Sequence, residues 1–223
     1  MKLVLLAGGL GTRMREETEY RPKPIVPIGV QPILWHIMKT YSHYNINDFV
    51  ICAVYKGNQI REYFRNYETM NTDFTIKIGA TSSIVTHGEL DEIGWSVTVS
   101  DTGPTTMTGG RIFKIKKYLE NETFMCTYGD GVADVDIDEL LRFHKAHGRI
   151  ATLTTVQPTS RFGVLDIEED GSIQEFREKP ISDGWINAGF FVFEPEIFDY
   201  LSEDCILERE PLAKLAEDSQ LIA

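Results

Sequence analysis

The sequence lacks the long apolar stretch of a membrane-spanning segment. Its longest apolar runs, such as residues 3–7, have the length of a β-strand, whereas crossing a bilayer takes about 20 apolar residues. The first of these runs is followed at once by glycines, which is too early for a secretory signal peptide. We therefore expect a cytoplasmic protein.

Cysteine is scarce as well, with three in 223 residues. Cys52, Cys126 and Cys205 lie far apart, and the sequence has neither a C-x-x-C pair nor the Cys and His spacing of a zinc site. Two of the three lie in apolar runs. We therefore expect buried free thiols and a reducing compartment.

Basic residues are outnumbered, because 22 Lys and Arg stand against 34 Asp and Glu, which gives a formal net charge of −12. A negative surface disfavours binding to nucleic acid and to an anionic membrane. It does not exclude a small anionic ligand, because a few Arg and Lys side chains in one cleft can bind phosphates. The position of the positive charges is therefore more informative than their number.

The sequence has no internal repeat, low-complexity tract or linker, and its length is that of one domain. Short apolar runs predict strands at residues 3–6, 49–54, 124–127 and 150–156. Apolar residues at helical spacing predict helices after Pro32 and at residues 59–67 and 136–147. This alternation predicts an α/β fold, a Rossmann-like, open, mixed and mainly parallel sheet with helices on both faces.

Two stretches depart from the alternation of strands and helices. Residues 74–101 alternate apolar and polar side chains, as in FTIKIG and WSVTVS, which predicts an antiparallel excursion. The stretch GVLDIEEDGSIQEFREKP predicts a β-hairpin with Asp170 and Gly171 in its turn. We expect these antiparallel additions to lie over one end of the sheet.

Glycines follow the first predicted strand directly, at Gly8, Gly9 and Gly11. In open α/β sheets, ligands bind at the carboxyl ends of the strands, and glycine lets backbone N–H groups approach a phosphate with no Cβ in the way. The stretch is not a Walker loop, and a dinucleotide fingerprint would need glycine at Met14. Taken alone, these glycines fit a phosphate loop and a plain turn equally well.

Two positive charges beside the glycines favour the phosphate loop. Arg13 stands two residues after Gly11, and a guanidinium can bind phosphate oxygens through two hydrogen bonds. Lys23 lies between Pro22 and Pro24, which restrict its backbone. A cation held rigidly beside a glycine loop predicts an anionic ligand.

The stretches LAGGLGTRMREET and RPKPIVPIGVQPILWHIM together resemble the signature of the sugar-1-phosphate nucleotidylyltransferases, whose pattern is G-G-x-G-T-R-L followed by K-P-x-x-P-[IV]. Met14 stands where the family usually has leucine. The resemblance implies that Arg13 and Lys23 act on the phosphates of a nucleotide. It also implies nucleotide contacts from the end of the first strand and the glycine loop, at Leu6, Ala7, Gly8, Gly9, Gly11 and Thr12.

A carboxylate follows the strand predicted at residues 124–127. Asp130 lies between two glycines in YGDGVADVD, and a hard oxygen ligand at this edge suits Mg²⁺, which is held by one or two carboxylates and substrate phosphates. The alternative is an Asp-Gly turn. We expect Asp136 to cap the next helix and Asp134 to lie in a loop. Their spacing also fits the D-x-D motif of glycosyltransferases, which lack the G-T-R and K-P motifs.

The stretch EFREKP resembles the E-K-P motif of the same family. The resemblance implies that Lys179 contacts the sugar phosphate as a catalytic residue and that Glu178 accepts hydrogen bonds from the sugar. The stretches RFG and INAGFFVF also occur in the family's order, which implies sugar contacts from Gly163 and Asn187. A charged strand end before a turn proline is the alternative for EFREKP alone. The phenylalanines that follow Asn187 are predicted core residues, at Phe190, Phe191 and Phe193.

Much of the remaining chain resembles the CTP-using branch of the family. Those enzymes carry D-T-G-x-x-x-M-T-G-G-R, which stands here at residues 101–111 and in the family closes over the nucleotide base. The resemblance implies nucleotide contacts from Thr108, Gly109, Gly110 and Arg111. A flexible glycine loop is the alternative, and the choice of cytosine over uracil rests on the resemblance alone.

The resemblance implies that CMP is transferred from CTP to α-D-glucose 1-phosphate with Mg²⁺, giving CDP-glucose for surface polysaccharides, in a cytoplasmic homo-oligomer. Another nucleotide or acceptor, and a non-catalytic nucleotide sensor, are the alternatives. The family continues to an M-D-T motif whose Asp is a second metal ligand, and the sequence stops at Ala223 without it. We therefore expect residues 1–223 to form one nucleotidylyltransferase domain without the family's C-terminal segment.

Overall fold

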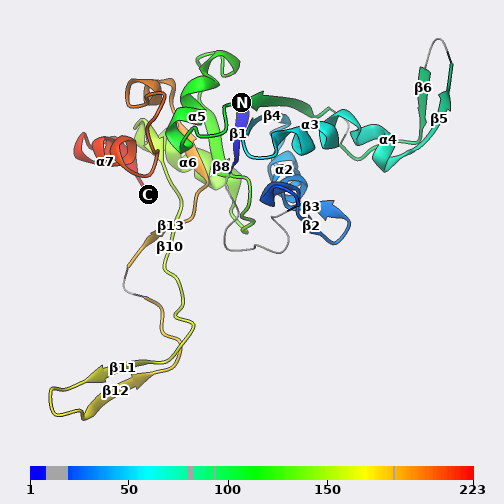
Figure 1. The fold of residues 1–223 in the computed structure, drawn as a ribbon. Helices are drawn as coiled ribbons and strands as arrows, with labels where there is room; N and C mark the ends of the chain where they lie inside the picture. The colour runs from blue at the N-terminus through cyan, green and yellow to red at the C-terminus, as the bar shows by residue number, and fades with distance from the viewer. Residues whose placement is uncertain (9–19, 80–82, 93, 183) are drawn as a thin grey trace.

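The apolar runs of the sequence form a central seven-stranded sheet (Figure 1) in the computed structural model, which describes residues 1–8, 20–79, 83–92, 94–182 and 184–223. The strand order is β15-β9-β14-β8-β1-β4-β7. The strands are β1 Lys2–Ala7, β4 Asp48–Ala53, β7 Ser96–Asp101, β8 Phe124–Tyr128, β9 Ala151–Thr152, β14 Phe191–Phe193 and β15 Leu221–Ile222. Only β14 runs antiparallel to its neighbours within this sheet. The predicted open, mixed and mainly parallel sheet is confirmed.

Helices cover both faces of the sheet, because the central strands are apolar on both sides. On one face, Leu3 and Leu5 of β1 pack in a cluster with α2, α3 and α6. On the other face, Val4 and Leu6 pack with α5, η3 and α7. The helices are α2 Ile33–His43, α3 Gly57–Arg65, α4 Tyr67–Asn71, α5 Thr108–Lys114, α6 Ile137–His147 and α7 Glu210–Glu217, with 3-10 turns η1 Lys23–Ile25, η2 Lys116–Tyr118 and η3 Pro195–Asp199.

The predicted helix ends are confirmed at α6. The Asp136 side chain accepts a hydrogen bond from the Glu139 N–H at 2.9 Å, and Gly148 closes the helix with a φ of 61°. Two other predicted elements are divided: the helix at 59–67 breaks at Asn66 into α3 and α4, and the strand at 150–156 becomes β9 and β10 (Thr155–Val156). β10 pairs with β13 (Ile186–Asn187) outside the central sheet.

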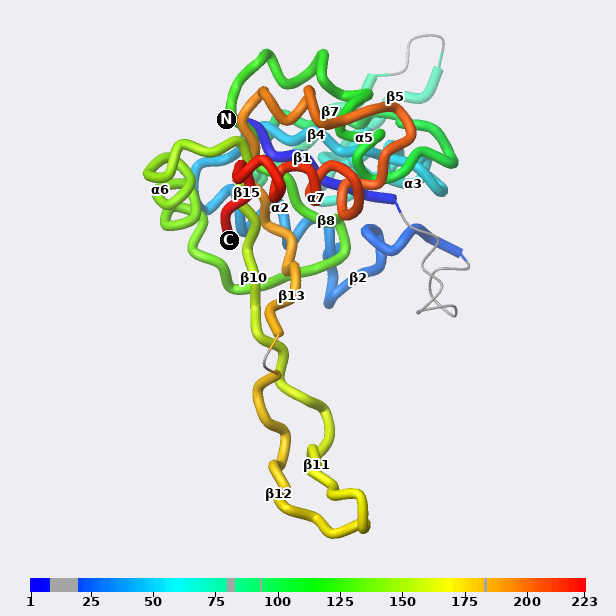
Figure 2. Tube along the Cα trace, turned by 90° about the vertical axis from the view of Figure 1, so that its left-hand side faces the viewer, coloured from blue at the N-terminus to red at the C-terminus, as the bar shows by residue number. Residues whose placement is uncertain are grey.

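The antiparallel additions are confirmed in part. β5 (Asp73–Lys77) pairs antiparallel with β6 (Ser83–His87), and β11 (Val164–Ile167) with β12 (Ile173–Arg177). A short hairpin of β2 (Pro27–Ile28) and β3 (Gln31–Pro32) is a further addition. Figures 1 and 2 show that the two long hairpins extend away from the sheet at different places, so the expectation that they cover one end was wrong. Their places follow from their connections, since one follows α4 and the other joins β10 to β13.

The assignment of residues 96–101 to an antiparallel excursion was wrong, because β7 pairs parallel with β4 as the edge of the central sheet. An edge strand has one side against the core, where Val97 and Val99 pack, and one polar side. Such a strand therefore alternates as an antiparallel strand does.

The three cysteines are free. The predicted burial is confirmed for Cys52 and Cys126, whereas Cys205 is half-buried. The phenylalanines predicted for the core are all buried, at Phe190, Phe191 and Phe193. In the part of the chain that the structure describes, no helix has the length and apolar character needed to span a bilayer.

Candidate active site

Two residues predicted from separate motifs meet at the carboxyl edge of the sheet. The Lys23 Nζ lies 2.7 Å from the Asp130 Oδ2, although 107 residues separate them in the chain. Both side chains are partly exposed, at 29% and 42%. The arrangement places an ammonium and a carboxylate together where β1 and β8 end, within reach of a ligand from solvent.

Local packing determines the position of both groups. Gly129 precedes Asp130 and lies against Ala7, where an added Cβ would be 3.1 Å from the Ala7 Cα, and its N–H donates to the Leu6 carbonyl at 3.2 Å. Lys23 opens η1, which is anchored by the buried Pro24. The loop after β8 is therefore held against the end of β1.

A buried arginine lies on the other side of the end of β1. The Arg111 guanidinium donates through NH1 to the Gly8 carbonyl and through Nε to the Thr106 carbonyl at 2.8 Å. An added Cβ on Gly8 would be 2.6 Å from the Arg111 NH1 and 2.7 Å from the Val54 side chain, so only glycine fits there. Burial lowers the pKa of Arg111 from its ordinary value.

Carbonyl groups only partly compensate the charge of Arg111. Among the described residues, no carboxylate forms an ion pair with its guanidinium, whose residue is 8% exposed. A buried cation costs free energy unless an opposite charge compensates it. This environment suits an anionic ligand next to Gly8.

The glycines of α5 are explained by packing in the described chain. An added Cβ on Gly109 would collide with Cys205, and one on Gly110 would collide with the Glu203 carbonyl. The predicted alternative, a flexible glycine loop, is therefore wrong, because these residues lie in a buried helix. Their contact with a nucleotide stays a prediction.

Sequence reasoning missed Tyr128 and Glu208. The Tyr128 hydroxyl donates to the Glu208 Oε1 at 2.6 Å, and the Thr108 hydroxyl donates to the Glu208 Oε2 at 2.6 Å. Asn187, a predicted sugar contact, donates to the Tyr128 hydroxyl at 3.3 Å. Burial raises the pKa of Tyr128, and its hydrogen bond to Glu208 raises it further. Tyr128 could have been found from its place two residues before Asp130, whereas nothing in the sequence marks Glu208.

The predicted sugar-phosphate residues Glu178 and Lys179 lie at the end of β12, on the arm formed by residues 155–187. The Lys179 Nζ lies 4.0 Å from the Glu178 Oε1, and both side chains are 62% exposed. Gly163 packs against the Phe176 ring and the Glu178 carboxylate, where an added Cβ would collide. Figures 1 and 2 show this arm extending away from the sheet, and among the described residues its charged pair forms no ion pair with Lys23 or Asp130. In one chain the Glu178–Lys179 pair is therefore separate from the Lys23–Asp130 pair, whereas Asn187, at the base of the arm, reaches Tyr128.

Some predicted residues cannot be placed. Gly9, Gly11, Thr12 and Arg13 lie outside the described residues. The strand residues before them, Leu6 and Ala7, are buried at the end of β1.

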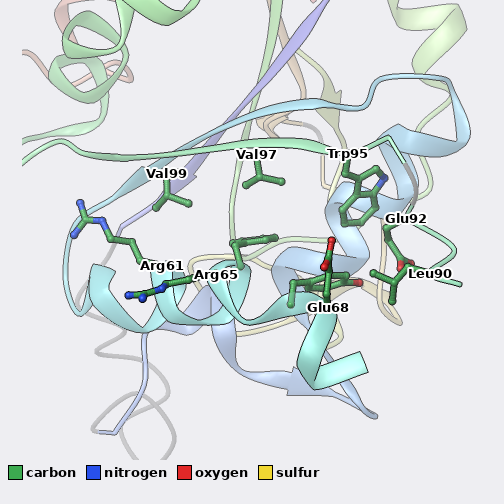
Figure 3. A pocket seen from close by; sticks show the side chains of 10 residues that line it. Arg61, Arg65, Glu68, Leu90, Glu92, Trp95, Val97 and Val99 are labelled. Carbon is green, nitrogen blue, oxygen red and sulfur yellow. The ribbon is translucent and has the colours of Figure 1, made fainter. Parts of the chain in front are cut away.

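One cavity of about 470 Å³ lies elsewhere, between α3, α4 and β7. Figure 3 shows Arg61 and Arg65 at one end of it and Trp95 and Glu92 at the other. None of its lining residues belongs to the predicted site. This cavity is therefore separate from the Lys23–Asp130 pair.

The described residues contain no cluster of three or more His, Cys, Asp or Glu side chains able to hold a metal ion. Asp130 offers one exposed carboxylate, which fits Mg²⁺ because this ion is usually held by one or two carboxylates together with substrate phosphates. Asp136 is occupied as a helix cap, and Asp134 lies in a loop, both as predicted.

The sheet, the glycines after β1 and the Lys23–Asp130 pair together are typical of enzymes that transfer nucleotidyl groups. The chain matches the nucleotidyl transferase family over residues 2–217. It belongs to this family.

The similar relatives within the family have narrower names than the family itself. The chain is 50% identical, over 226 aligned residues, to the glucose-1-phosphate cytidylyltransferase of Salmonella typhi, covering all of this chain and 87% of the relative. It is 45% identical to the probable glucose-1-phosphate cytidylyltransferase of Bacillus subtilis, covering 99% of this chain and 86% of the relative.

Solved structures share the fold. HddC from Yersinia pseudotuberculosis superposes with a TM-score of 0.66 at 24% identity, covering 96% of this chain and 85% of that one. A putative glucose-1-phosphate thymidylyltransferase from Bacillus anthracis gives 0.66 at 20% identity, covering 100% and 85%. At these identities the likeness concerns the fold.

Proposed function

We propose that this protein transfers CMP from CTP to α-D-glucose 1-phosphate, giving CDP-glucose and pyrophosphate. The meeting of Lys23 and Asp130 at the carboxyl edge of the sheet carries the proposal, because it places a cation and a hard oxygen ligand where a triphosphate would lie. The identity of 50% and 45% with cytidylyltransferases over nearly the whole chain supports CTP and glucose 1-phosphate as the substrates.

The reaction is an in-line displacement at the α-phosphorus of CTP. A phosphate oxygen of glucose 1-phosphate forms a bond to this phosphorus, and the bond to the bridging oxygen breaks, so that pyrophosphate leaves with the electron pair. The attacking oxygen is already anionic, so no general base is required. The protein's task is to hold two polyanions together and to stabilise the charge of the transition state.

The charged residues at the carboxyl edge divide this task. Lys23 lies by the α-phosphate, and Arg13 holds the β- and γ-phosphates. Arg111, buried beside Gly8, adds positive charge at the nucleotide. When a phosphate binds, it replaces Asp130 as the partner of Lys23, which leaves the Asp130 carboxylate available to a cation.

Asp130 is the residue that would hold Mg²⁺. When bound there, a divalent cation would supply positive charge that offsets the negative charge of the triphosphate. The exposed carboxylate, 42% accessible and paired with Lys23, fits this role.

The acceptor is bound by residues of the arm and its base. Lys179 holds the phosphate of glucose 1-phosphate, Glu178 accepts hydrogen bonds from the sugar hydroxyls, and Gly163 and Asn187 complete the contacts. Glu178 and Lys179 follow β12 on the arm, which extends away from the sheet, so catalysis requires the arm to take another position or to meet the sheet edge of a second chain.

The proposed homo-oligomer, in the cytoplasm, would explain why apolar side chains are exposed on the arm. Monomeric soluble proteins rarely expose large apolar patches. On the arm, the exposed apolar side chains are Val156, Phe162, Val164, Leu165, Ile167, Ile173, Phe176, Ile181, Trp185 and Ile186. A second copy of the chain would cover them, and the CDP-glucose made would serve the synthesis of surface polysaccharide.

The test is pyrophosphate release from the purified protein with Mg²⁺, each of CTP, UTP, dTTP, ATP and GTP, and a panel of sugar phosphates. We expect release with CTP and glucose 1-phosphate. Release with another pair would keep the family reaction and overturn the proposed substrates. Binding of CTP without release under any condition would indicate a nucleotide sensor and contradict the proposal.

A further inference from the structure

Two hydroxyl groups from distant parts of the chain meet at the Glu208 carboxylate. Tyr128 is the last residue of β8 and Thr108 the first residue of α5, and each lies 2.6 Å from one of the two carboxylate oxygens. Such short oxygen–oxygen distances are typical of hydrogen bonds to an ionised carboxylate. Glu208 therefore joins the end of a central strand to the start of a helix.

Further hydrogen bonds reach the two hydroxyls, and every donor in this network points toward Glu208. The Asn187 Nδ2 donates to the Tyr128 hydroxyl at 3.3 Å, and the Leu207 N–H donates to the Thr108 hydroxyl at 3.0 Å. Each hydroxyl thus accepts one hydrogen bond and donates its own proton to Glu208. An ionised carboxylate only accepts, so it suits two donors at once.

The segment that carries Glu208 is held firmly, although Glu208 is exposed. The Gly110 N–H donates to the Cys205 carbonyl at 3.1 Å, and Leu207 is fully buried in the core. The close packing of Gly109 and Gly110 on this segment leaves no room for side chains. Because the backbone is already ordered, forming the two hydrogen bonds costs less conformational entropy than it would on a mobile loop.

These contacts connect the two groups of predicted site residues. Thr108 belongs to the predicted nucleotide contacts and Asn187 to the predicted sugar contacts, while Tyr128 stands two residues before Asp130. We propose that Glu208 is a positioning residue that holds Asn187 toward the acceptor through Tyr128 and holds the start of α5 toward the nucleotide through Thr108. The proposal rests on the proposed function and gives Glu208 no contact with substrate.

The test compares KM for CTP and for glucose 1-phosphate in Glu208→Ala, Glu208→Gln and Tyr128→Phe. Glu208→Ala is expected to raise both KM values about tenfold, since it removes two hydrogen bonds to a charged group. Glu208→Gln keeps one acceptor oxygen for two donors, so at most one of the two values should return to within about threefold of wild type. Tyr128→Phe breaks only the acceptor branch, so it should raise KM for glucose 1-phosphate alone.

A double variant shows whether the two residues act together. If Tyr128 acts through Glu208, adding Tyr128→Phe to Glu208→Ala should change KM for glucose 1-phosphate by less than about twofold, because the branch is already broken. Glu210→Ala is the matched control, because it removes one carboxylate two residues away and is expected to leave both KM values unchanged.

Three results would overturn the proposal. They are a Glu208→Ala protein with wild-type KM values, a loss of thermal stability as its sole effect, and additive effects in the double variant. If wild type turns over another nucleotide or acceptor, the same ratios are measured with that pair. If wild type turns over none, the proposed function fails, and the ratios are read in dissociation constants for CTP and glucose 1-phosphate from calorimetry.

Discussion

Lys23 and Asp130 show at the scale of single residues how function and stability separate. Their side chains form a 2.7 Å ion pair but remain 29% and 42% exposed. Exposed ion pairs of this kind contribute about 0–1 kcal/mol to stability. Their removal should therefore affect chemistry far more than folding.

Replacement of Lys23 tests this separation. Lys23→Ala should lower kcat about 10²–10³-fold, because it removes a positive charge from the transition state. The melting temperature should stay near that of wild type, as measured by circular dichroism. Lys145→Ala is a control for the loss of a lysine, because Lys145 is exposed in the last turn of α6. Wild-type turnover in the Lys23 variant would remove this residue from the mechanism.

Single residues also show how far sequence could predict the site. Asp130 was predicted because the strand before it limits where its side chain can lie. Lys23 was predicted because its flanking prolines limit its backbone in the same way. Arg111 was predicted from resemblance, but its burial against the Gly8 carbonyl was not visible in the spacing. Glu208 could not be predicted, because an exposed acid near a helix start has no distinctive pattern and its partners lie 80 and 100 residues away.

At the scale of elements, α5 owes its position to glycines, whose lack of a side chain allows close packing. The Gly110 position faces the Glu203 carbonyl so closely that any Cβ would displace backbone. This contact holds α5 against the segment that leads to α7. The sequence TGGR fits both a flexible loop and a tightly packed helix, and only the tertiary packing distinguishes these two structures.

Replacement of Gly110 tests this packing. Gly110→Ala should lower the free energy of unfolding by about 1–3 kcal/mol, as overpacking of a tight contact does. Gly131→Ala is the matched control, because an added Cβ there has no neighbour within 4 Å. Urea unfolding measures both. Equal stability of the two variants would contradict the packing described for α5.

Helix α6 is joined to the sheet through two histidines. The buried His144 lies 2.7 Å from the Thr152 hydroxyl through Nδ1 and 3.0 Å from the Glu194 carboxylate through Nε2, and the His147 Nε2 lies 2.7 Å from the same hydroxyl. The pKa of His147 is lowered, first by burial and then by the neighbouring charges of His144 and Arg149.

This lowered pKa predicts a pH dependence of stability. Below the ordinary histidine pKa near 6.5, the unfolded chain binds a proton at His147 that the folded chain does not yet bind. The free energy of unfolding should therefore fall as pH falls below about 6.5. His147→Gln should have a shallower dependence in urea unfolding between pH 5 and pH 8. A variant as steep as wild type would assign the dependence to other groups.

Elements also differ in how well sequence predicts them. The buried strands β1, β4 and β8 were predicted within one residue at each end, because their apolar runs have no other explanation. β7 was misassigned because an edge strand alternates like an antiparallel one, and the break at Asn66 was missed because apolar spacing continues through it. Side-chain periodicity indicates which face of a strand is buried. It does not indicate which strand is the neighbour or whether the two run parallel.

At the scale of the whole molecule, the arm separates the predicted residues into two groups. Lys23, Asp130 and Arg111 lie at the sheet, and Glu178 and Lys179 lie on the arm (Figure 2). The apolar side chains of the arm are exposed, which supports the proposed partner surface. A second copy of the chain could both cover the arm and complete a site.

Light scattering tests the proposed homo-oligomer. Wild type should have a mass that is a multiple of the chain mass. Phe162→Ser combined with Trp185→Ser, at positions 77% and 65% exposed, should shift the mass toward one chain and lower activity in parallel. Val30→Ser is the control, because Val30 is 95% exposed in the β2–β3 hairpin turn. A monomeric and fully active wild type would contradict this arrangement.

The most direct test of nucleotidyl transfer follows labelled phosphorus from CTP. The protein is incubated with glucose 1-phosphate, Mg²⁺ and CTP labelled either at the α-phosphorus or at the γ-phosphorus, and the products are separated. Attack at the α-phosphorus predicts that the α-label appears in CDP-glucose and the γ-label in pyrophosphate. Transfer of the γ-label to the sugar phosphate, or retention of both labels in CTP by a folded protein that binds it, would contradict the account.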